Sequence, residues 1–431
     1  MQPKVLCHQT VPPTRWNKSA GVNSYGETMR RKTKLHTIAC ALVVAWVVAA
    51  GPVRAQESTS RAPIAPNKKP NIVFILVDNV GWSNFQVYGG TIPTPRIDKL
   101  ASEGIRFNNY NVEVQCTPSR SAIMTGRHPV RSGTYTVPFP GQGKAGLSPW
   151  EYTIAKLLSD TGYATALYGK WHLGNTQGRL PNDQGFDEWW GIMNSWDEAG
   201  YTAWPQFKET GVPVPMIWEG RKGEPSKPVM PLDLQVRPIV DEKYIIPKTI
   251  DYIKRNAAAK KPFFVYVGYS ELHEPIIPNP NFANKSPERS GHVADCIAEM
   301  DFRVGQILDA IKEAGIDDNT IIILSSDNAT GGATPQDGGR QNGPWRGDFF
   351  YTPFEGSMRA PAMIRWPGKV PAGVVTEQML AAVDWLPTVG RDGGRVESGA
   401  QGSSHRRRRR LSVHVGQEQY DRPRHLHVLR Q

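Results

Sequence analysis

A short segment near the first third of this 431-residue chain has the residue types of a nucleophilic site. It reads Cys-Thr-Pro-Ser-Arg over residues 116–120. Pro118 suits the first turn of a helix and Gly126 suits its end, so Cys116 is predicted to lie at a helix N-terminus. The backbone N–H groups there favour an anion, and Arg120 follows one turn later. Cys116 is therefore a candidate thiolate nucleophile, with a small buried thiol as the alternative.

Two hydrophobic segments, each followed by an Asp-Asn pair, are predicted to be buried strands. The segments are residues 71–77 and 320–326, and the pairs are Asp78-Asn79 and Asp327-Asn328. Asp or Asn after a strand is usually a turn former or a helix cap. Two such pairs at one sheet edge, however, would supply the hard oxygen ligands that Ca²⁺ or Mg²⁺ requires. No Cys/His cluster with zinc spacing occurs, so a soft-metal site is not expected.

Two further predicted strands lead into lysine and histidine residues. Residues 163–168 precede Lys170 and His172, and residues 263–269 precede His273. A lone loop histidine is more often structural than catalytic. In open α/β sheets, however, ligands bind at the carboxyl ends of the strands, and four strands here end in polar or ionisable residues. This repetition favours one common site.

The chain between these residues alternates predicted strands with predicted helices. Helices are expected over residues 151–160 and 241–258, each before a strand, and over residues 377–389. Such alternation predicts an α/β fold with a mostly parallel sheet. The length and the 39% hydrophobic content allow a sizeable core, and they exclude a disordered, collagen-like or disulfide-stapled chain. Cys116 and Cys296 are the two cysteines outside the N-terminal region, and the sequence leaves open whether they pair.

The net charge of +11 invites a nucleic-acid interpretation, but the charge lies at the two ends of the chain. Residues 1–55 carry +7 and residues 391–431 carry +6, which leaves residues 56–390 at −2. No nucleic-acid partner is therefore expected for the body of the chain.

The basic N-terminal end has the order of a secretory signal peptide. Basic residues between positions 30 and 34 precede an apolar run over residues 38–50 and a small-residue site that ends at Ala55. The run has 13 residues, fewer than the roughly 20 needed to span a bilayer. We therefore expect a bacterial protein that is periplasmic or secreted and has no stable membrane anchor. Met29 directly precedes the basic residues and is the predicted start.

Taken together, the motifs resemble the sulfatase family of the alkaline-phosphatase superfamily. The family signature is similar to Cys-Thr-Pro-Ser-Arg followed by Thr125-Gly126-Arg127, and a second family motif is similar to Gly-Lys-Trp-His-Leu-Gly at residues 169–174. The metal-binding pair of the family is similar to Asp327-Asn328, and the loop that contacts sulfate is similar to His273-Glu274-Pro275. The resemblance extends from about residue 71 to about residue 389. It implies a three-layer α/β/α sandwich with a mostly parallel central sheet, and hydrolysis of an aryl or carbohydrate sulfate ester to an alcohol and inorganic sulfate.

The resemblance also implies a role for each candidate residue. Cys116 would be oxidised to formylglycine by a separate maturing enzyme. The expected metal ligands are Asp78, Asn79, Asp327, Asn328 and the modified Cys116, with Ca²⁺ favoured over Mg²⁺, and the groups around the sulfate are Arg120, Lys170, His172 and His273. One hydroxyl of the hydrated aldehyde would attack sulfur and expel the alcohol, and loss of a proton from the other would then expel sulfate. Either His172 or His273 would protonate the leaving alcohol.

The sequence departs from the family pattern at three places. Asn79 stands where many relatives have a second Asp, which predicts a weaker and less charged metal site. Phe350 stands where relatives often have a sulfate-contacting Lys, and we expect Arg346 or Arg359 to compensate. After residue 390 the composition changes abruptly, and we expect the C-terminal subdomain of the family to be missing.

These features divide the chain into five predicted parts. They are an artefactual extension (1–28), the signal peptide (29–55), a linker (56–70), the catalytic domain (71–390), and a basic disordered tail (391–431) that we interpret as a frameshift product. A functional tail that binds anionic partners is the alternative for the last part.

Two other functions remain open at this point. The same superfamily geometry suits a phosphate or phosphonate monoester hydrolase, and a truncated chain could be an inactive homologue. An aromatic-rich stretch could stack on a sugar or aryl group or belong to the core; its members are Trp189, Trp190, Trp196, Tyr201, Trp204 and Trp218.

Overall fold

The computed structural model describes most of the region between residues 69 and 393. The described residues are 69–139, 143, 145–286, 291–331, 342–350 and 353–393. The predicted extension, the signal peptide, nearly all of the linker and the tail from residue 394 onward lie outside them.

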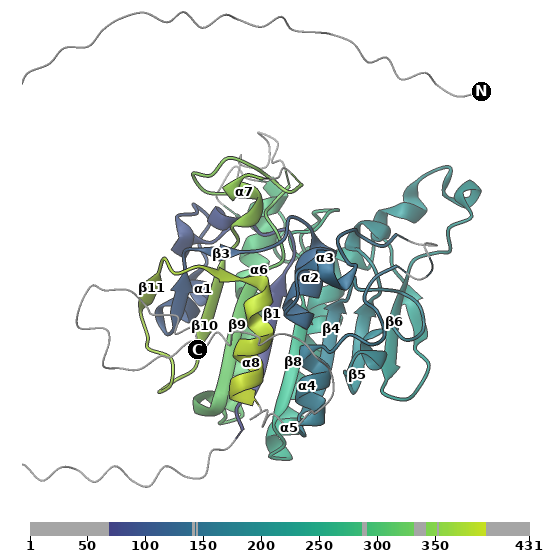
Figure 1. The fold of residues 1–431 in the computed structure, drawn as a ribbon. Coiled ribbons are helices and arrows are strands. Elements are labelled where there is room, and N and C mark those ends of the chain that lie inside the picture. Colours follow the sequence, from purple (N-terminus) through teal and green to yellow (C-terminus); the bar gives the residue numbers. More distant parts are fainter. Residues whose placement is uncertain are drawn as a thin grey trace, which may run out of the picture. The chain divides into compact units, whose positions relative to one another are not determined.

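A sheet of ten strands runs through the described residues, in the order β11-β2-β10-β9-β1-β8-β4-β5-β6-β7 (Figure 1). Its five central strands are parallel and are β9 (Thr320–Ser326), β1 (Asn71–Val77), β8 (Phe263–Gly268), β4 (Ala164–Lys170) and β5 (Glu188–Ile192). The outer strands are β10 (Ala362–Arg365), β2 (Ile105–Phe107) and β11 (Val374–Thr376) on one side, and β6 (Met216–Arg221) and β7 (Lys227–Pro231) on the other. β10, β6 and β7 run antiparallel to their inner neighbours, so the predicted mostly parallel sheet is confirmed.

The hydrophobic character of the central strands follows from their burial on both faces. All seven residues of β1 and of β9 are buried, as continuous apolar runs in a parallel sheet require. Both strands have the predicted bounds. β4 extends two residues beyond the predicted end, so Lys170 is the last residue of the strand and does not follow it.

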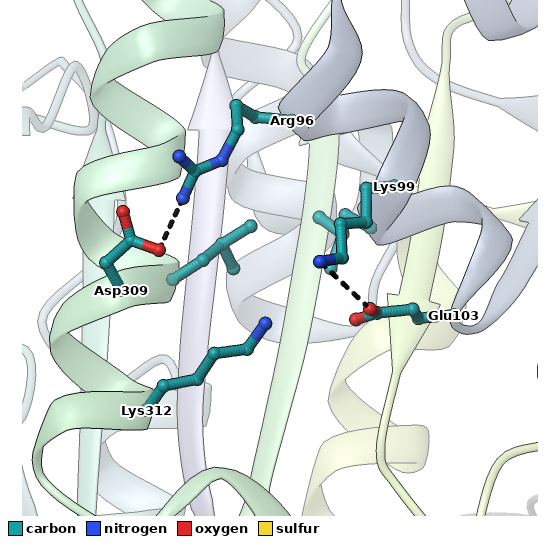
Figure 2. Close-up of a pocket in the computed structure, with 7 residues that line it drawn as sticks. Arg96, Lys99, Glu103, Asp309 and Lys312 are labelled. Atoms are coloured by element: carbon teal, nitrogen blue, oxygen red, sulfur yellow. Dashed lines mark hydrogen bonds and ion pairs between the residues drawn. The ribbon is translucent and has the colours of Figure 1, made fainter.

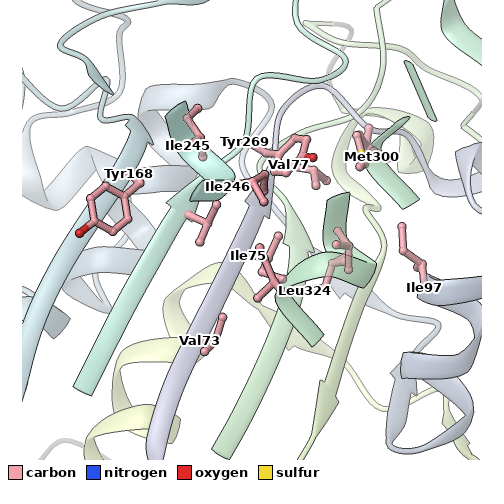
Figure 3. Packing of buried hydrophobic residues seen from close by; sticks show 14 of the residues in the cluster. Val73, Ile75, Val77, Ile97, Tyr168, Ile245, Ile246, Tyr269, Met300 and Leu324 are labelled. Atoms are coloured by element: carbon pink, nitrogen blue, oxygen red, sulfur yellow. The ribbon is translucent and has the colours of Figure 1, made fainter. Parts of the chain in front are cut away.

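Helices cover both faces of the sheet, which gives the expected three layers. One face carries α1 (Pro95–Ser102), α5 (Ile246–Ala258) and α6 (Gly291–Glu313), and the other carries α2 (Cys116–Thr125), α4 (Ile154–Asp160) and α8 (Trp385–Gly393). Val73, Ile75 and Val77 of β1 pack into the first of these two cores (Figure 3). The alternate residues Ile72, Phe74 and Leu76 pack into the second. Two short helices, α3 (Pro129–Ser132) and α7 (Glu355–Met358), are the other α-helices of the described residues.

Helix starts differ from the sequence predictions where local or tertiary bonds intervene. α4 begins at Ile154 because the Thr153 side chain caps it by accepting from the Lys156 N–H at 3.0 Å. α5 begins at Ile246, after a π-helical turn over Asp241–Ile245.

The helix predicted over residues 377–389 is wrong in its first part. Leu380–Ala381 forms strand β12, which pairs with β3 (Tyr110–Asn111) in a small second sheet. The Leu380 N–H donates to the carbonyl of Asn109 at 3.0 Å, so pairing with a distant segment overrides the local helical pattern. The helix itself, α8, starts at Trp385.

None of the helices within the described residues combines the length and the apolar character that crossing a bilayer requires.

Candidate active site

All five central strands end at the same edge of the sheet, and polar residues follow each of them. Asp78 and Asn79 follow β1, Asp327 and Asn328 follow β9, His172 follows β4 (whose last residue is Lys170), His273 follows β8, and Ser195 follows β5. Because the strands are parallel and adjacent, segments far apart in the chain meet at this edge. The sheet thus assembles the predicted site residues in one place.

Helix α2 brings Cys116 to this edge. The helix begins at Cys116 and is capped after Thr125 by Gly126, whose φ of 62° is the left-handed conformation that glycine favours. All ten of its residues are buried. The Thr117 hydroxyl donates to the carbonyl of His172 at 2.8 Å, which fastens the helix to the loop after β4. The predicted helix N-terminus at Cys116 is therefore present.

The Cys116 thiol is protonated in this environment. Its side chain is 3% exposed, and its Sγ lies 3.7 Å from Oδ1 of Asp78, to which it donates. Burial raises the pKa of the thiol well above its usual value. An activated thiolate is therefore not favoured, and the unmodified cysteine is a poor nucleophile. Cys116 and Cys296 are both free and buried, so they do not pair.

Two buried carboxylates and two buried cations form the centre of the site. Oδ2 of Asp78 lies 2.8 Å from Nζ of Lys170 and 3.1 Å from Nη2 of Arg120. Nε of Arg120 donates to Oδ2 of Asp327 at 2.9 Å. All four side chains are fully buried, and their charges balance.

The pKa values of the two carboxylates move in opposite directions. Burial by itself raises the pKa of Asp78, but the positive charge of Lys170 and its neighbours outweighs burial and lowers the pKa to about 2. Burial, reinforced by the charge of Asp78, raises the pKa of Asp327 to about 6. Arg120 contacts both carboxylates, so its positive charge offsets the repulsion between Asp78 and Asp327.

The oxygen atoms at this edge fit a hard metal ion. Nδ2 of Asn328 donates to Oδ1 of Asn79 at 2.6 Å, while its own Oδ1 is buried and has no hydrogen-bond partner among the described residues. Oδ1 of Asp327 accepts a long 3.3 Å bond from the Asn79 N–H. Together with Asp78 these residues offer two carboxylates and two amide oxygens, the ligand chemistry of Ca²⁺.

Both predicted histidines are buried beside the cations. A ring nitrogen of His273, Sγ of Cys116 and an Asp78 oxygen all lie within 4.8 Å of one another. Burial first, and then the charge of Lys170, lowers the pKa of His273 to about 4. The same two causes lower the pKa of His172 well below its usual value. Both imidazoles are therefore neutral at neutral pH in this state.

Ser195 is a site residue that the sequence reasoning missed. Its hydroxyl lies 3.2 Å from Nζ of Lys170 and 3.0 Å from Nε2 of His273, so it bridges two of the predicted groups. Ser195 follows β5 by three residues. The sequence does hold a signal for it, because β5 is a fifth parallel strand that leads into polar residues, but its Trp189-Trp190 pair is equally typical of a stacking surface.

Comparison with known proteins agrees with this geometry. The profile of the family described as Sulfatase matches residues 70–391. The chain belongs to the sulfatase family. It is 33% identical to N-acetylgalactosamine-6-sulfatase of Canis lupus familiaris over an aligned region of 330 residues. This region covers 74% of this chain and 61% of that relative. This member of the family therefore spans about three fifths of the length of that protein.

Solved structures of sulfatases share the fold. The PsFucS1 sulfatase from Pseudoalteromonas sp. has a TM-score of 0.70 and 33% identity, with 76% of this chain and 68% of that chain covered. A protein of the alkaline phosphatase superfamily from Vibrio parahaemolyticus, at a TM-score of 0.50 and 21% identity over 76% of this chain and 67% of that chain, shares the fold alone. The expected alkaline-phosphatase-like architecture is therefore confirmed.

The sulfatase position expected to hold a lysine carries Phe350, which is 57% exposed and packs edge-on against Phe349. Arg359 pairs with Glu355 and donates to the carbonyl of Asn108 at 3.0 Å. Arg346 lies over the ring of Phe354 at 4.0 Å. None of these contacts involves the residues around Cys116, and compensation by either arginine stays a prediction.

The aromatic-rich stretch of this family member divides into core and surface. Trp189, Trp190 and Trp196 are buried. Trp204 is 56% exposed and stacks on Tyr201, with ring centroids 5.0 Å apart. The alternative of a stacking surface therefore survives for Tyr201 and Trp204, which lie in and just after the 3₁₀ helix η4 (Trp196–Ala203).

A small pocket of about 250 Å³ lies elsewhere, between α1 and the last turns of α6 (Figure 2). Its charged groups are largely paired, with Arg96 bound to Asp309 at 2.5 Å and Lys99 to Glu103 at 3.9 Å. The end of α6 leads into the start of β9, so this pocket is at the opposite end of the sheet from Cys116.

Proposed function

We propose that this chain hydrolyses a sulfate ester to an alcohol or phenol and inorganic sulfate. The observation that carries the proposal is the single buried cluster at the sheet edge, where Cys116 and Asp78 meet Lys170, Arg120 and His273. A sulfate ester resists attack because its oxygens repel nucleophiles. A site that combines a nucleophile with several cationic donors offsets that charge in the transition state.

The nucleophile is proposed to be formylglycine, made from Cys116 by a separate maturing enzyme. The buried thiol is protonated and poorly nucleophilic, whereas a hydrated aldehyde offers one hydroxyl to attack sulfur and a second whose deprotonation releases sulfate. Lys170 and Arg120 lie within a few ångströms of Asp78 and would hold the anionic group beside this position.

The metal is proposed to be Ca²⁺, held by Asp78, Asn79, Asp327 and Asn328 with the modified Cys116. When bound, it would withdraw charge from the sulfate oxygens. Four protein oxygens from two strand ends suit Ca²⁺ better than Mg²⁺, because Mg²⁺ usually keeps several waters and binds through one or two carboxylates.

The general acid is proposed to be His273. Its ring nitrogen is within 4.8 Å of Cys116 Sγ, and Nε2 shares a hydrogen bond with Ser195. Its Nδ1 lies 2.8 Å from the carbonyl of Glu274, which fixes the ring orientation. In the neutral imidazole the proton lies on Nδ1, which faces this carbonyl, so Nε2 would first gain a proton as the anionic sulfate ester offsets the charge of Lys170, and would then pass that proton to the leaving alcohol. His172 would then serve as a donor to the sulfate group.

The proposed substrate is an aryl or carbohydrate sulfate. The similarity to N-acetylgalactosamine-6-sulfatase and the exposed Trp204 beside Tyr201 both support a sugar as the alcohol. The protein is proposed to work in the periplasm or outside the cell. Support for that location comes from the signal-peptide pattern of residues 29–55.

The experiment is to express the chain with a formylglycine-generating enzyme and compare its rates on an aryl sulfate and the matching aryl phosphate. Mass spectrometry of the peptide around Cys116 should show loss of sulfur and gain of an aldehyde. C116A, which cannot be oxidised, is the control and should be inactive. Faster phosphate hydrolysis would replace the proposal with a phosphate or phosphonate monoester hydrolase, and turnover of neither ester by converted protein would indicate an inactive homologue.

A further inference from the structure

Arg237 is a fully buried arginine that lies outside the charge cluster around Asp78. It begins the short 3₁₀ helix η6 (Arg237–Ile239), well before β8 in the sequence. Its Nη1 donates to Oγ of Ser270 at 2.9 Å, and its Nη2 donates to the carbonyls of Ser270 at 2.9 Å and His273 at 2.8 Å. The guanidinium also lies over the Trp196 ring, 5.7 Å from the centroid.

These contacts join the two loops whose tips form the Ser195–His273 hydrogen bond. Trp196 is the residue after Ser195, so the cation–π contact fixes one loop directly beside the serine. The bond to the His273 carbonyl fixes the other loop at the histidine itself. Ser195 Oγ and His273 Nε2 meet at 3.0 Å between the two anchored points. Arg237 therefore acts on both partners without touching either side chain.

The surroundings of Arg237 explain why a charge is buried here. Nη1 of Arg237 lies 3.7 Å from Oε1 of Glu271, and the Ser270 hydroxyl in turn donates to Oδ2 of Asp241. A buried guanidinium is tolerated because these acids and three acceptors surround it. Lysine carries the same charge but has no planar fork, so it cannot bridge these acceptors in the same geometry.

We propose that Arg237 is a positioning residue that holds His273 against Ser195 for proton transfer to the leaving group. The inference rests on the proposed function, since it assigns a supporting residue to the proposed acid. A purely structural arginine would stabilise the fold without affecting the proton-transfer step.

The test compares R237K with R365K in the formylglycine-containing protein. Arg365 is a matched control: it is 6% exposed and makes a bidentate pair with Asp317 at 2.8 Å, on strand β10. Both variants should lose stability. We measure kcat for aryl sulfates whose phenols have increasing pKa values, because poor leaving groups depend most on the acid.

R237K is expected to lower kcat about tenfold or more for the least acidic phenols and about twofold or less for the most acidic, with KM nearly unchanged. R365K should leave this dependence as in the wild type. Equal effects of R237K on all leaving groups, or a matching change in R365K, would overturn the proposal.

A structural readout separates this proposal from the proposed function. Crystal structures of the unmodified wild type and R237K should show the 3.0 Å contact between Ser195 Oγ and His273 Nε2 lost in the variant; a retained contact would contradict the inference whether or not any sulfate ester is hydrolysed. If R237K fails to fold, S270A removes one of the three hydrogen bonds and should give the same leaving-group trend with smaller amplitude; no such trend in S270A would then refute the proposal.

Discussion

Asn79 differs from the aspartate of the family pattern in one side-chain atom, and this difference changes the charge of the proposed metal site. Its backbone φ of 57° places it in the left-handed region, which Asn tolerates better than most residues. Its amide oxygen accepts from Asn328 at 2.6 Å, so the side chain is held at the sheet edge. In the proposed site the residue would thus contribute an oxygen without a charge, where the family pattern would have placed a carboxylate.

Replacing Asn79 by Asp is expected to tighten Ca²⁺ binding. The carboxylate would still accept the hydrogen bond from Asn328 and would add one negative charge to the ligand set. We expect a decrease in Kd of roughly tenfold, about 1.4 kcal/mol. Calorimetric titration of Ca²⁺ into a C116A background measures this without depending on maturation or turnover.

The opposite substitution supplies the matching control. D327N removes a charge from the same ligand set and should weaken Ca²⁺ binding by a similar factor. Weaker binding in N79D, or no change in both variants, would mean that these oxygens do not hold the ion.

At the scale of elements, three central strands approach one another at a row of glycines just before the site. Gly169 of β4 pairs with Gly268 of β8 on one side and with Gly191 of β5 on the other. A Cβ added to Gly169 would lie 1.9 Å from the carbonyl oxygen of Gly268, and φ is +110° there. Only glycine satisfies both conditions, and the row lies one residue before Lys170.

G169A is therefore expected to destabilise the protein by more than about 4 kcal/mol or to prevent soluble expression. G200A is the control, since a Cβ at Gly200 would meet no atom within 4 Å and its φ is ordinary; its effect should stay within about 0.5 kcal/mol. Chemical denaturation of both variants measures the difference. Similar stability of the two variants would show that β4 and β8 do not pack as described.

The helix η4 connects the buried site to an exposed aromatic surface. It begins one residue after Ser195, and the stacked pair Tyr201 and Trp204 lies at its far end. W204A should raise KM for a sulfated oligosaccharide about tenfold while leaving KM for a small aryl sulfate unchanged, because the substitution removes the exposed ring on which a sugar would stack. W150A, which removes another exposed tryptophan (80% exposed), is the control. Equal effects of both variants on the oligosaccharide would exclude a stacking role for Trp204.

Most of what the sequence predicts about the site comes from the residues that follow the predicted strands. β1 and β9 are recognisable because burial on both faces demands continuous apolar runs, and their bounds fix where Asp78 and Asp327 lie. The predicted helix start at residue 377 is wrong because Leu380 pairs with β3, a contact that no local sequence pattern indicates. The role of Arg237 could not be predicted from the sequence for the same reason, since its three acceptors lie more than 30 residues away in the sequence.

At the scale of the whole molecule, the body has a small net charge but buries many ionisable groups. Several buried carboxylates have raised pKa values because burial disfavours their charged form: Asp241 to about 7, Glu299 to about 8 and Glu198 to about 8. Glu198, in η4, is the simplest of these to isolate, because it lies outside the Asp241–Glu271–Glu299 group.

Glu198 makes folding stability depend on pH in a defined window. Its pKa rises from 4.5 in the unfolded chain to about 8 in the folded protein, so between these values the folded state holds a proton that unfolding releases. Below pH 4.5 both states are protonated and no penalty exists. As the pH rises towards 8, this group reduces stability by at most about 1.4 kcal/mol per pH unit.

E198Q removes that dependence, because glutamine is neutral at every pH and nearly isosteric. The stability of E198Q relative to the wild type should therefore increase steadily between about pH 5 and about pH 8 and level off above. E209Q is the control, since Glu209 is exposed on the neighbouring helix η5 (Phe207–Thr210). Its curve of stability against pH should run parallel to that of the wild type. Denaturant melts at several pH values give the three curves. Parallel curves for E198Q and the wild type would mean that Glu198 is ionised in the folded protein, and the burial of η4 against the rest of the molecule would have to be revised.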